Sequence, residues 1–74
     1  MPLVITDYNL PGMNGLQLTA ALKARAPATH VILITSYAPP DMSRRAQDRG
    51  VDSMLPKPFH PDTLIQAVQA VLAQ

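Results

Sequence analysis

Three polar side chains in this sequence stand at the ends of short apolar runs: Asp7, Thr35 and Lys57. A carboxylate such as Asp7 can attack phosphorus and form an aspartyl phosphate, which is nucleophilic catalysis with the protein itself as substrate. The phosphoryl oxygens need hydrogen-bond donors and cations, and a threonine hydroxyl and a lysine ammonium supply them. The residue types therefore predict phosphoryl chemistry, provided that the fold brings the three side chains together.

The apolar runs have the composition of buried parallel strands. They are short, contain several β-branched residues, and cover residues 3–6, 30–35 and 51–56. In an open α/β sheet, the carboxyl ends of parallel strands lie along one edge, where ligands collect. We therefore expect Asp7, Thr35 and Lys57 to share that edge.

Helices and loops are predicted between these runs. Residues 15–26 form a predicted helix with Asn14 as its N-cap. Residues 42–49 form a second one, with Asp41 as a capping residue and Gly50 as a left-handed C-terminal cap. Turn-forming residues predict loops over 9–15 and 36–40.

The last helix begins near Pro61 and carries an apolar stripe at helical spacing: Leu64, Ile65, Val68, Val71 and Leu72. We expect this helix to pack on the sheet. The predicted fold is α/β with the order β-α-β-α-β-α, in which right-handed crossovers join a three-stranded parallel sheet.

The amino-acid composition limits the kinds of protein that this chain can be. The 74 residues suit one small, marginally stable domain over residues 1–74, and the 47% hydrophobic content suits a folded chain. Six basic and five acidic residues are scattered, so no nucleic-acid surface is predicted. No apolar run approaches the roughly 20 residues that cross a bilayer, so no membrane contact is predicted. Cysteine is absent, which fits a cytoplasmic location.

Three segments together resemble the receiver domain of two-component response regulators. They are Asp7-Tyr8-Asn9-Leu10-Pro11-Gly12-Met13-Asn14-Gly15, Leu33-Ile34-Thr35-Ser36-Tyr37 and Leu55-Pro56-Lys57-Pro58-Phe59. Their order and spacing match the family, and the resemblance implies a partial flavodoxin-like, receiver-like fold.

The resemblance also implies a function. Asp7 would accept a phosphoryl group from a histidine kinase or phosphotransfer protein, with Thr35 and Lys57 as its partners. Asp7 and the backbone carbonyl of Asn9 would bind Mg²⁺, a hard cation that prefers oxygen ligands. Pro58 takes the place of the family's cis proline.

Two departures from the family bear on activity. A full receiver begins with a strand that ends in two acidic residues, followed by a helix, a strand and a helix, so this chain resembles only the C-terminal part. Because the acidic pair normally supplies further contacts to Mg²⁺, we expect weak metal binding. Met54 stands where receivers usually carry an aromatic switch residue, so the usual threonine-aromatic coupling is not expected.

Each candidate residue has a plainer explanation when taken singly. Asp7 could cap a turn, Thr35 could end a strand, and Lys57 could be an ordinary surface lysine; only the three together favour a site. His30 and His60 have no second ligand at metal spacing, so a strand entry and a helix cap explain them better than a metal site.

The missing half would leave the strand from Leu3 to Thr6 with an open apolar edge, and such edges pair with other chains. We therefore predict a homodimer, joined antiparallel through the Leu3 to Thr6 edge about a two-fold axis. The favoured function is a phosphoaccepting receiver and not an enzyme. The alternatives are a half-receiver that acts only as a dimerisation or interaction module, and an enzyme on a small phosphorylated substrate.

Overall fold

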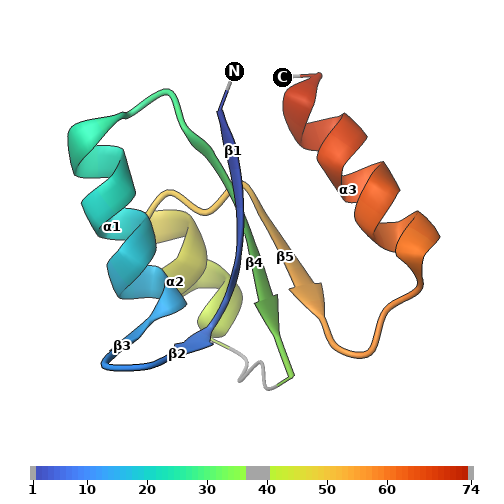
Figure 1. The fold of residues 1–74 in the computed structure, drawn as a ribbon, viewed down its shortest axis with the longest axis horizontal. Helices are drawn as coiled ribbons and strands as arrows, with labels where there is room; N and C mark the ends of the chain where they lie inside the picture. Colours follow the sequence, from blue (N-terminus) through green and yellow to red (C-terminus); the bar gives the residue numbers. More distant parts are fainter. Residues whose placement is uncertain (1, 37–40, 74) are drawn as a thin grey trace.

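A parallel sheet of three strands forms the centre of the molecule. The computed structural model describes residues 2–36 and 41–73, so most of the predicted loop at 36–40 lies outside the described residues. The strands β1 (Leu3–Asp7), β4 (His30–Thr35) and β5 (Ser53–Pro56) lie side by side in the order β1-β4-β5, all parallel. Figure 1 shows their carboxyl ends at one end of the sheet. The predicted α/β class and the three-stranded parallel sheet are confirmed.

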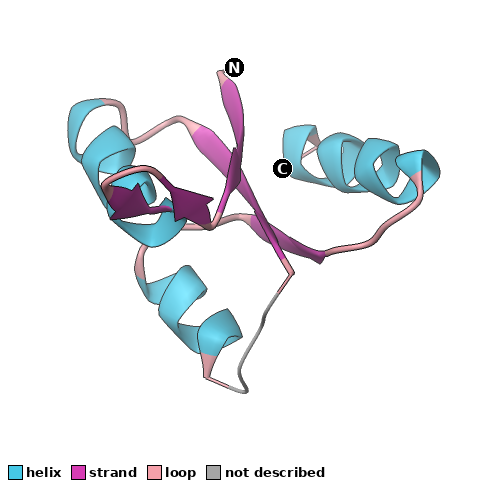
Figure 2. Cartoon of the chain, turned by 60° about the horizontal axis from the view of Figure 1, so that its bottom comes forward, coloured by secondary structure: helices cyan, strands magenta, loops and turns pink. Residues whose placement is uncertain are grey.

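Three helices cover the two faces of the sheet. The helices α1 (Gly15–Arg25) and α2 (Met42–Asp48) lie on one face, and α3 (Pro61–Leu72) lies on the other (Figure 2). Successive right-handed crossovers place their helices on the same face, which explains the shared position of α1 and α2. After β5 the chain turns, and α3 runs back antiparallel to the strands (Figure 1).

The helix ends follow mostly from local sequence. Asn14 caps α1 in a capping box, in which its side chain accepts from the Gln17 backbone and the Gln17 side chain accepts from the Asn14 backbone. Gly50 adopts φ +91° after α2, as a left-handed cap requires. Asp41 occupies the N-cap position of α2, but its side chain makes no capping hydrogen bond, so the predicted role of that side chain is wrong.

A small antiparallel hairpin follows β1 where a shaped loop was expected. It pairs β2 (Asn9–Leu10) with β3 (Met13–Asn14), and Gly12 takes φ +78° at its tip. Two residues per strand are too few for an alternating pattern to stand out in the sequence. The hairpin gives the segment between Asp7 and α1 a fixed course.

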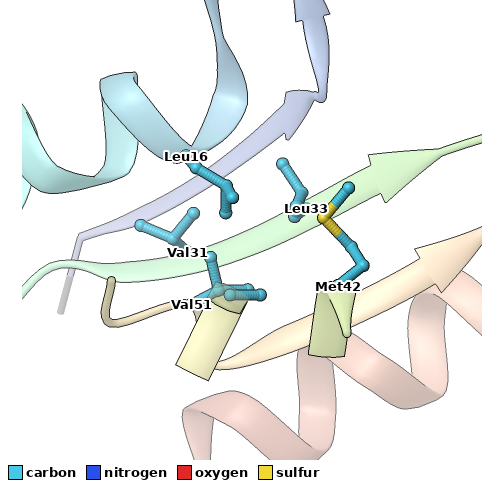
Figure 3. Packing of buried hydrophobic residues seen from close by; sticks show 6 residues of the cluster. Leu16, Val31, Leu33, Met42 and Val51 are labelled. Atoms are coloured by element: carbon cyan, nitrogen blue, oxygen red, sulfur yellow. The ribbon is translucent and has the colours of Figure 1, made fainter. Parts of the chain in front are cut away.

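The larger core lies between the sheet and the pair α1 and α2. Figure 3 shows side chains from α1, β4, α2 and the segment before β5 gathered on this face; the labelled ones are Leu16, Val31, Leu33, Met42 and Val51. These residues are buried, together with Ala46 of α2. Helix α2 has few apolar residues, but Met42 and Ala46 both point into this core and attach the helix to the sheet.

The second core lies under α3 and is narrower. Ile32, Leu55 and Val71 are buried there, and Leu64 and Val68 are half-buried against them. Ile65 and Leu72 remain 53% and 45% exposed. The predicted packing of this helix on the sheet is confirmed, but two residues of its apolar stripe stay exposed because α3 lies mainly over β4 and β5.

Strand β1 is an edge of the described sheet. The His30 N–H donates to the Pro2 carbonyl, and the Tyr8 N–H donates to the Ile34 carbonyl. Backbone groups alternate in direction along a strand, so the even-numbered residues of β1 face β4, and the N–H and C=O of Leu3 and Ile5 face outward. The sheet therefore has an open backbone edge at β1.

Candidate functional site

The three predicted site residues lie at the carboxyl edge of the sheet. Asp7 ends β1 and pairs with Ile34, Thr35 ends β4, and Lys57 follows β5 directly. The Lys57 N–H donates to the Thr35 carbonyl at 2.8 Å, which ties the segment after β5 to the end of β4. Parallel strand order thus brings residues separated by 50 positions in sequence to one place.

Asp7 and Lys57 form a direct ion pair. The Lys57 Nζ donates to Asp7 Oδ2 at 2.6 Å, and the two side chains are 42% and 39% exposed. The hydrogen bond from Lys57 lowers the pKa of Asp7 below its ordinary value, with smaller contributions from the Asn9 and Tyr8 backbones. Asp7 is therefore an ionised, solvent-accessible carboxylate at neutral pH, in the state that a nucleophile needs.

Thr35 differs from its two neighbours in being buried. It pairs with Pro56 across β4 and β5, one position beyond the Ile34 that pairs with Asp7. The structure brings its backbone to the site edge, as predicted. The contact of its hydroxyl with a phosphoryl group stays a prediction.

Gly15 positions the backbone that carries Asp7, and the sequence argument missed it. Its N–H donates to the Tyr8 carbonyl at 2.7 Å. A Cβ built on Gly15 would lie 2.7 Å from the Asp7 carbonyl oxygen and would also collide with the Leu33 side chain. The first residue of α1 therefore packs directly against the end of β1, which only glycine allows. The one sequence signal was a glycine at the start of a helix, where it lowers helix propensity.

The resemblance predicted a Mg²⁺ site at Asp7 and Asn9. The available donors are of the right kind, since a carboxylate and a backbone carbonyl both offer hard oxygen. They are few, and the described residues contain no group of three or more His, Cys, Asp or Glu that could hold a metal ion. Mg²⁺ commonly keeps several waters and binds through one or two protein oxygens plus a phosphate, so this donor set fits a weak site that phosphate completes.

A second aspartate-lysine pair lies at the opposite, amino end of the sheet. Asp52 precedes β5; its Oδ2 accepts from the Val31 N–H at 2.8 Å and lies 3.5 Å from Lys23 Nζ. Its Oδ1 lies 3.6 Å from His30 Nδ1. Burial raises the pKa of Asp52, but the Val31 N–H, Lys23 and His30 together lower it further, so the net value lies below the ordinary one. The sequence argument did not single out Asp52, because nothing in a lone aspartate before a strand shows which N–H it will accept from.

Met54, the residue that replaces the family's aromatic, is half-buried beside the larger core. It also lines a cavity of about 230 Å³ between α2 and β5, together with Ser43, Gln47 and Val51. The flexible methionine contributes to packing here and carries no hydroxyl that could change partners.

Comparison of the sequence with models of known protein families identifies the family of this chain. The model of the response regulator receiver domain matches residues 1–69. The chain belongs to the response regulator receiver family. The receiver is thereby part of two-component phosphorelay signalling, and the alternative of a half-receiver that serves only as an interaction module is not favoured.

Curated relatives support the same family. The receiver is 37% identical over 71 residues to the transcriptional activator protein ExaE of Pseudomonas putida, covering 96% of this chain and 33% of that protein. It is 39% identical over 66 residues to the response regulator protein FleR of Pseudomonas aeruginosa, covering 89% of this chain and 14% of that protein. The chain thus spans a third or less of these relatives.

Solved structures agree with the fold. A CheY-like response regulator receiver domain protein from Methanospirillum hungatei superposes with a TM-score of 0.89 at 27% identity, over 99% of this chain and 58% of that one. The response regulator DrrB of Thermotoga maritima gives a TM-score of 0.88 at 30% identity, over 96% of this chain and 33% of that one.

Receiver domains generally bind Mg²⁺ at the phosphorylation site and interact with histidine kinases or phosphotransfer proteins. No helix among residues 2–36 and 41–73 is long and apolar enough to cross a membrane.

Proposed function

We propose that Asp7 is the phosphoacceptor of this receiver and takes a phosphoryl group from a histidine kinase or phosphotransfer protein. The observation that carries the proposal is the 2.6 Å ion pair between Lys57 Nζ and Asp7 Oδ2 in an open part of the surface. It provides an ionised nucleophile, a cation beside it, and room for an incoming donor. In this role the chain is a phosphorylated substrate and not an enzyme that turns over a separate small molecule.

Lys57 and Thr35 would serve the transferred group. As the phosphoryl group attaches to Asp7, negative charge spreads over its three outer oxygens. The ammonium of Lys57 already lies within hydrogen-bond distance of the carboxylate, so a small movement would bring it to a phosphoryl oxygen. The Thr35 hydroxyl would be the second donor.

Mg²⁺ would bind through Asp7 and the Asn9 carbonyl and supply positive charge to the phosphoryl oxygens. With these two protein ligands and one of them paired to Lys57, we expect weak binding that phosphate strengthens. Phosphorylation by a small donor should therefore rise with Mg²⁺ over the millimolar range instead of saturating at low concentration.

The test is incubation with acetyl phosphate and Mg²⁺, followed by intact-mass measurement. Wild type should gain the mass of one phosphoryl group, and Asp7→Asn should gain none. Asp52→Asn is the matched control, because Asp52 also pairs with a lysine, Lys23; it should be phosphorylated as wild type is. Uptake that persists in Asp7→Asn would disprove the assignment.

A homodimer through the edge from Leu3 to Thr6 is also part of the proposal. The outward N–H and C=O groups of Leu3 and Ile5 support it, because an open edge without a charged residue over residues 3–6 offers a template for pairing. Antiparallel pairing about a two-fold axis would give a continuous sheet of both copies. Sedimentation should show a dimer at micromolar concentration, and a cooperatively melting monomer would contradict it. A cytoplasmic location fits the proposed partners.

A further inference from the structure

The dipeptide Asn14-Gly15 joins the hairpin to α1 and is the one asparagine-glycine sequence in the chain. An asparagine followed by glycine is prone to spontaneous deamidation, because glycine has no side chain to keep its backbone nitrogen away from the asparagine carboxamide. The other asparagine, Asn9, precedes Leu10 and lacks this feature. Asn14 therefore combines its structural role as an N-cap with a chemical reactivity of its own.

Deamidation joins the side chain of Asn14 to the backbone of Gly15. The Gly15 nitrogen loses its proton and bonds to Asn14 Cγ, the bond from Cγ to Nδ2 breaks, and Nδ2 leaves as ammonia after taking up a proton. Water then opens the resulting succinimide ring at one of its two carbonyl carbons and gives either aspartate or isoaspartate. In isoaspartate the main chain runs through the side-chain carbon, so one extra carbon separates the two residues.

The folded structure opposes this ring closure at both reacting atoms. The Gly15 N–H donates to the Tyr8 carbonyl at 2.7 Å, so the proton that must leave is held in a hydrogen bond. The Gln17 N–H donates to Asn14 Oδ1 at 2.9 Å, and the Asn14 N–H donates to Gln17 Oε1 at 2.8 Å, so the carboxamide is fixed toward the first turn of α1. Gly15 is also buried. Attack on Cγ therefore requires the first turn of α1 to separate from the end of β1.

The junction between β3 and α1 is suited to such local opening. The hairpin before it pairs only two residues on each strand, and both hydrogen bonds of the capping box are exposed. Figure 1 shows this hairpin on the outside of the molecule, at the end of β1. Segments with exposed hydrogen bonds and few buried contacts open more often than the core does. Opening at the junction can therefore occur without global unfolding.

From this geometry we propose that Asn14 is a covalent modification site, that opening of the β3–α1 junction controls its deamidation, and that the isoaspartyl product separates α1 from the strand that carries Asp7. The effect on phosphorylation rests on the proposed phosphoacceptor role of Asp7. The reaction consumes only water, so it needs neither a partner nor an enzyme.

The two products should differ in their effect on the fold. Aspartate at position 14 is as good an N-cap as asparagine, and it adds a negative charge to the first turn of α1, which has no acidic residue of its own. Isoaspartate lengthens the main chain before Gly15 by one carbon–carbon bond, about 1.5 Å. A Cβ on Gly15 would already lie 2.7 Å from the Asp7 carbonyl oxygen, so the junction has no room for added atoms. We expect isoaspartate to lift the start of α1 from β1 and to lower the rate of phosphorylation at Asp7.

Peptide mapping by mass spectrometry tests whether the fold controls the reaction. Purified wild type is kept in mildly alkaline buffer and, in parallel, in the same buffer with urea, and the conversion of Asn14 is followed with Asn9 as an internal control. Asn14 should convert at least about tenfold more slowly in the native protein than in urea, because only opened molecules react. Asn9 should stay unchanged under both conditions.

A pair of glutamine variants tests the role of the junction. Gln17→Ala removes the acceptor of the Asn14 N–H, so it should raise the native rate of conversion about fivefold, as the loss of one capping interaction predicts, and leave the rate in urea unchanged. Gln66→Ala is the matched control, because Gln66 is an exposed glutamine of α3, and it should change neither rate. Equal wild-type rates in the two buffers, or a native rate that Gln17→Ala leaves unchanged, would overturn the control by opening. Absence of conversion in urea would overturn the modification site itself.

Phosphorylation tests the consequence for Asp7. Ion exchange separates deamidated chains from unmodified ones, because both products carry an added negative charge, and the refolded pool is then incubated with acetyl phosphate and Mg²⁺. Uptake by this pool should fall short of uptake by Asn14→Asp in proportion to the isoaspartate content, whereas Asn14→Asp should match wild type. Equal uptake by the pool and by Asn14→Asp would show that the junction does not affect Asp7. Failure of wild type to take up a phosphoryl group would instead refute the phosphoacceptor role, and the conversion rates of Asn14 would still decide whether opening controls its deamidation.

Discussion

Within residues 2–36 and 41–73 the receiver has two aspartate-lysine pairs, one at each end of its sheet, and they differ in exposure and in their other contacts. At the carboxyl end, Asp7 and Lys57 lie 2.6 Å apart with about two fifths of each side chain exposed. At the amino end, Asp52 and Lys23 lie 3.5 Å apart and are 18% and 24% exposed. The closer pair is thus the more open one.

The difference lies in what else holds each carboxylate. Asp52 accepts from the buried Val31 N–H, and its own N–H donates to the Val31 carbonyl, so it fixes the start of β4 against the segment before β5. Asp7 depends mainly on its hydrogen bond from the exposed Lys57 side chain, with smaller contributions from the Asn9 and Tyr8 backbones. An exposed ion pair adds little stability, so this pair can be broken by an incoming group at small cost. The exposure of Asp7 suits its proposed phosphoacceptor role, whereas the backbone contacts of Asp52 suit a structural one.

The largest expected effect separates the two lysines. Lys57→Ala should lower the rate of phosphorylation by acetyl phosphate about 100-fold, the usual loss when one positioned donor to a developing charge is removed. Lys23→Ala should leave the rate unchanged, because Lys23 lies at the other end of the sheet. Time-resolved intact-mass measurement checks both. Equal phosphorylation rates for the two variants would contradict the proposed difference between Lys57 and Lys23.

The next largest effect is a difference in stability between variants of two glycines, one near each aspartate-lysine pair. Gly15→Ala should destabilise the fold by about 2–3 kcal/mol, because the added Cβ meets the Asp7 carbonyl oxygen and the buried Leu33 side chain. Gly50→Ala should cost only about 1 kcal/mol, since its positive φ disfavours a side chain but the nearest atoms belong to the flexible stem of Lys23. Urea unfolding of both variants tests the order. A smaller loss for Gly15→Ala would show that the end of β1 can shift.

The amino-end pair should matter for stability alone. Asp52→Ala leaves the buried Val31 N–H without its acceptor and should cost about 1–2 kcal/mol. Asp7→Ala should leave the unfolding midpoint close to that of wild type, because its carboxylate is solvent-exposed. Chemical unfolding of the two variants provides the measurement. A larger loss for Asp7→Ala than for Asp52→Ala would reverse the roles assigned here.

The carboxyl end was more predictable from sequence than the amino end, for a physical reason. Strand composition gives strand ends, and parallel strands put those ends on one edge, so Asp7, Thr35 and Lys57 could be grouped before any coordinates. Asp52 acts through a particular backbone N–H, and Gly15 acts through close approach of two backbones. Both contacts depend on the positions of backbone atoms to within a few tenths of an ångström, and residue type and spacing do not predict positions so closely.

The apolar stripe of α3 gives a further example, in which the sequence predicts the helix but not which of its apolar residues are buried. Its period correctly predicts a helix with one apolar side. It does not say how much sheet lies beneath that side, so the exposure of Ile65 and Leu72 became visible only with the position of α3 over β4 and β5.

The smallest expected effect is a pH dependence that distinguishes the two aspartates. The pKa of Asp52 is lowered in the folded protein, so Asp52 stabilises the fold above its unfolded pKa of about 3.9, and this stability is lost as the pH falls through the lower, folded pKa. The difference in melting temperature between wild type and Asp52→Asn should therefore stay constant above about pH 5 and shrink below about pH 4. Asp7 has a lowered pKa as well, but solvent screens its partner, so the same comparison with Asp7→Asn should show a weaker change of the same sign. Thermal melts across this pH range measure both, and a difference for Asp52→Asn that grows on acidification would contradict the assignment of its carboxylate to the folded state's stability.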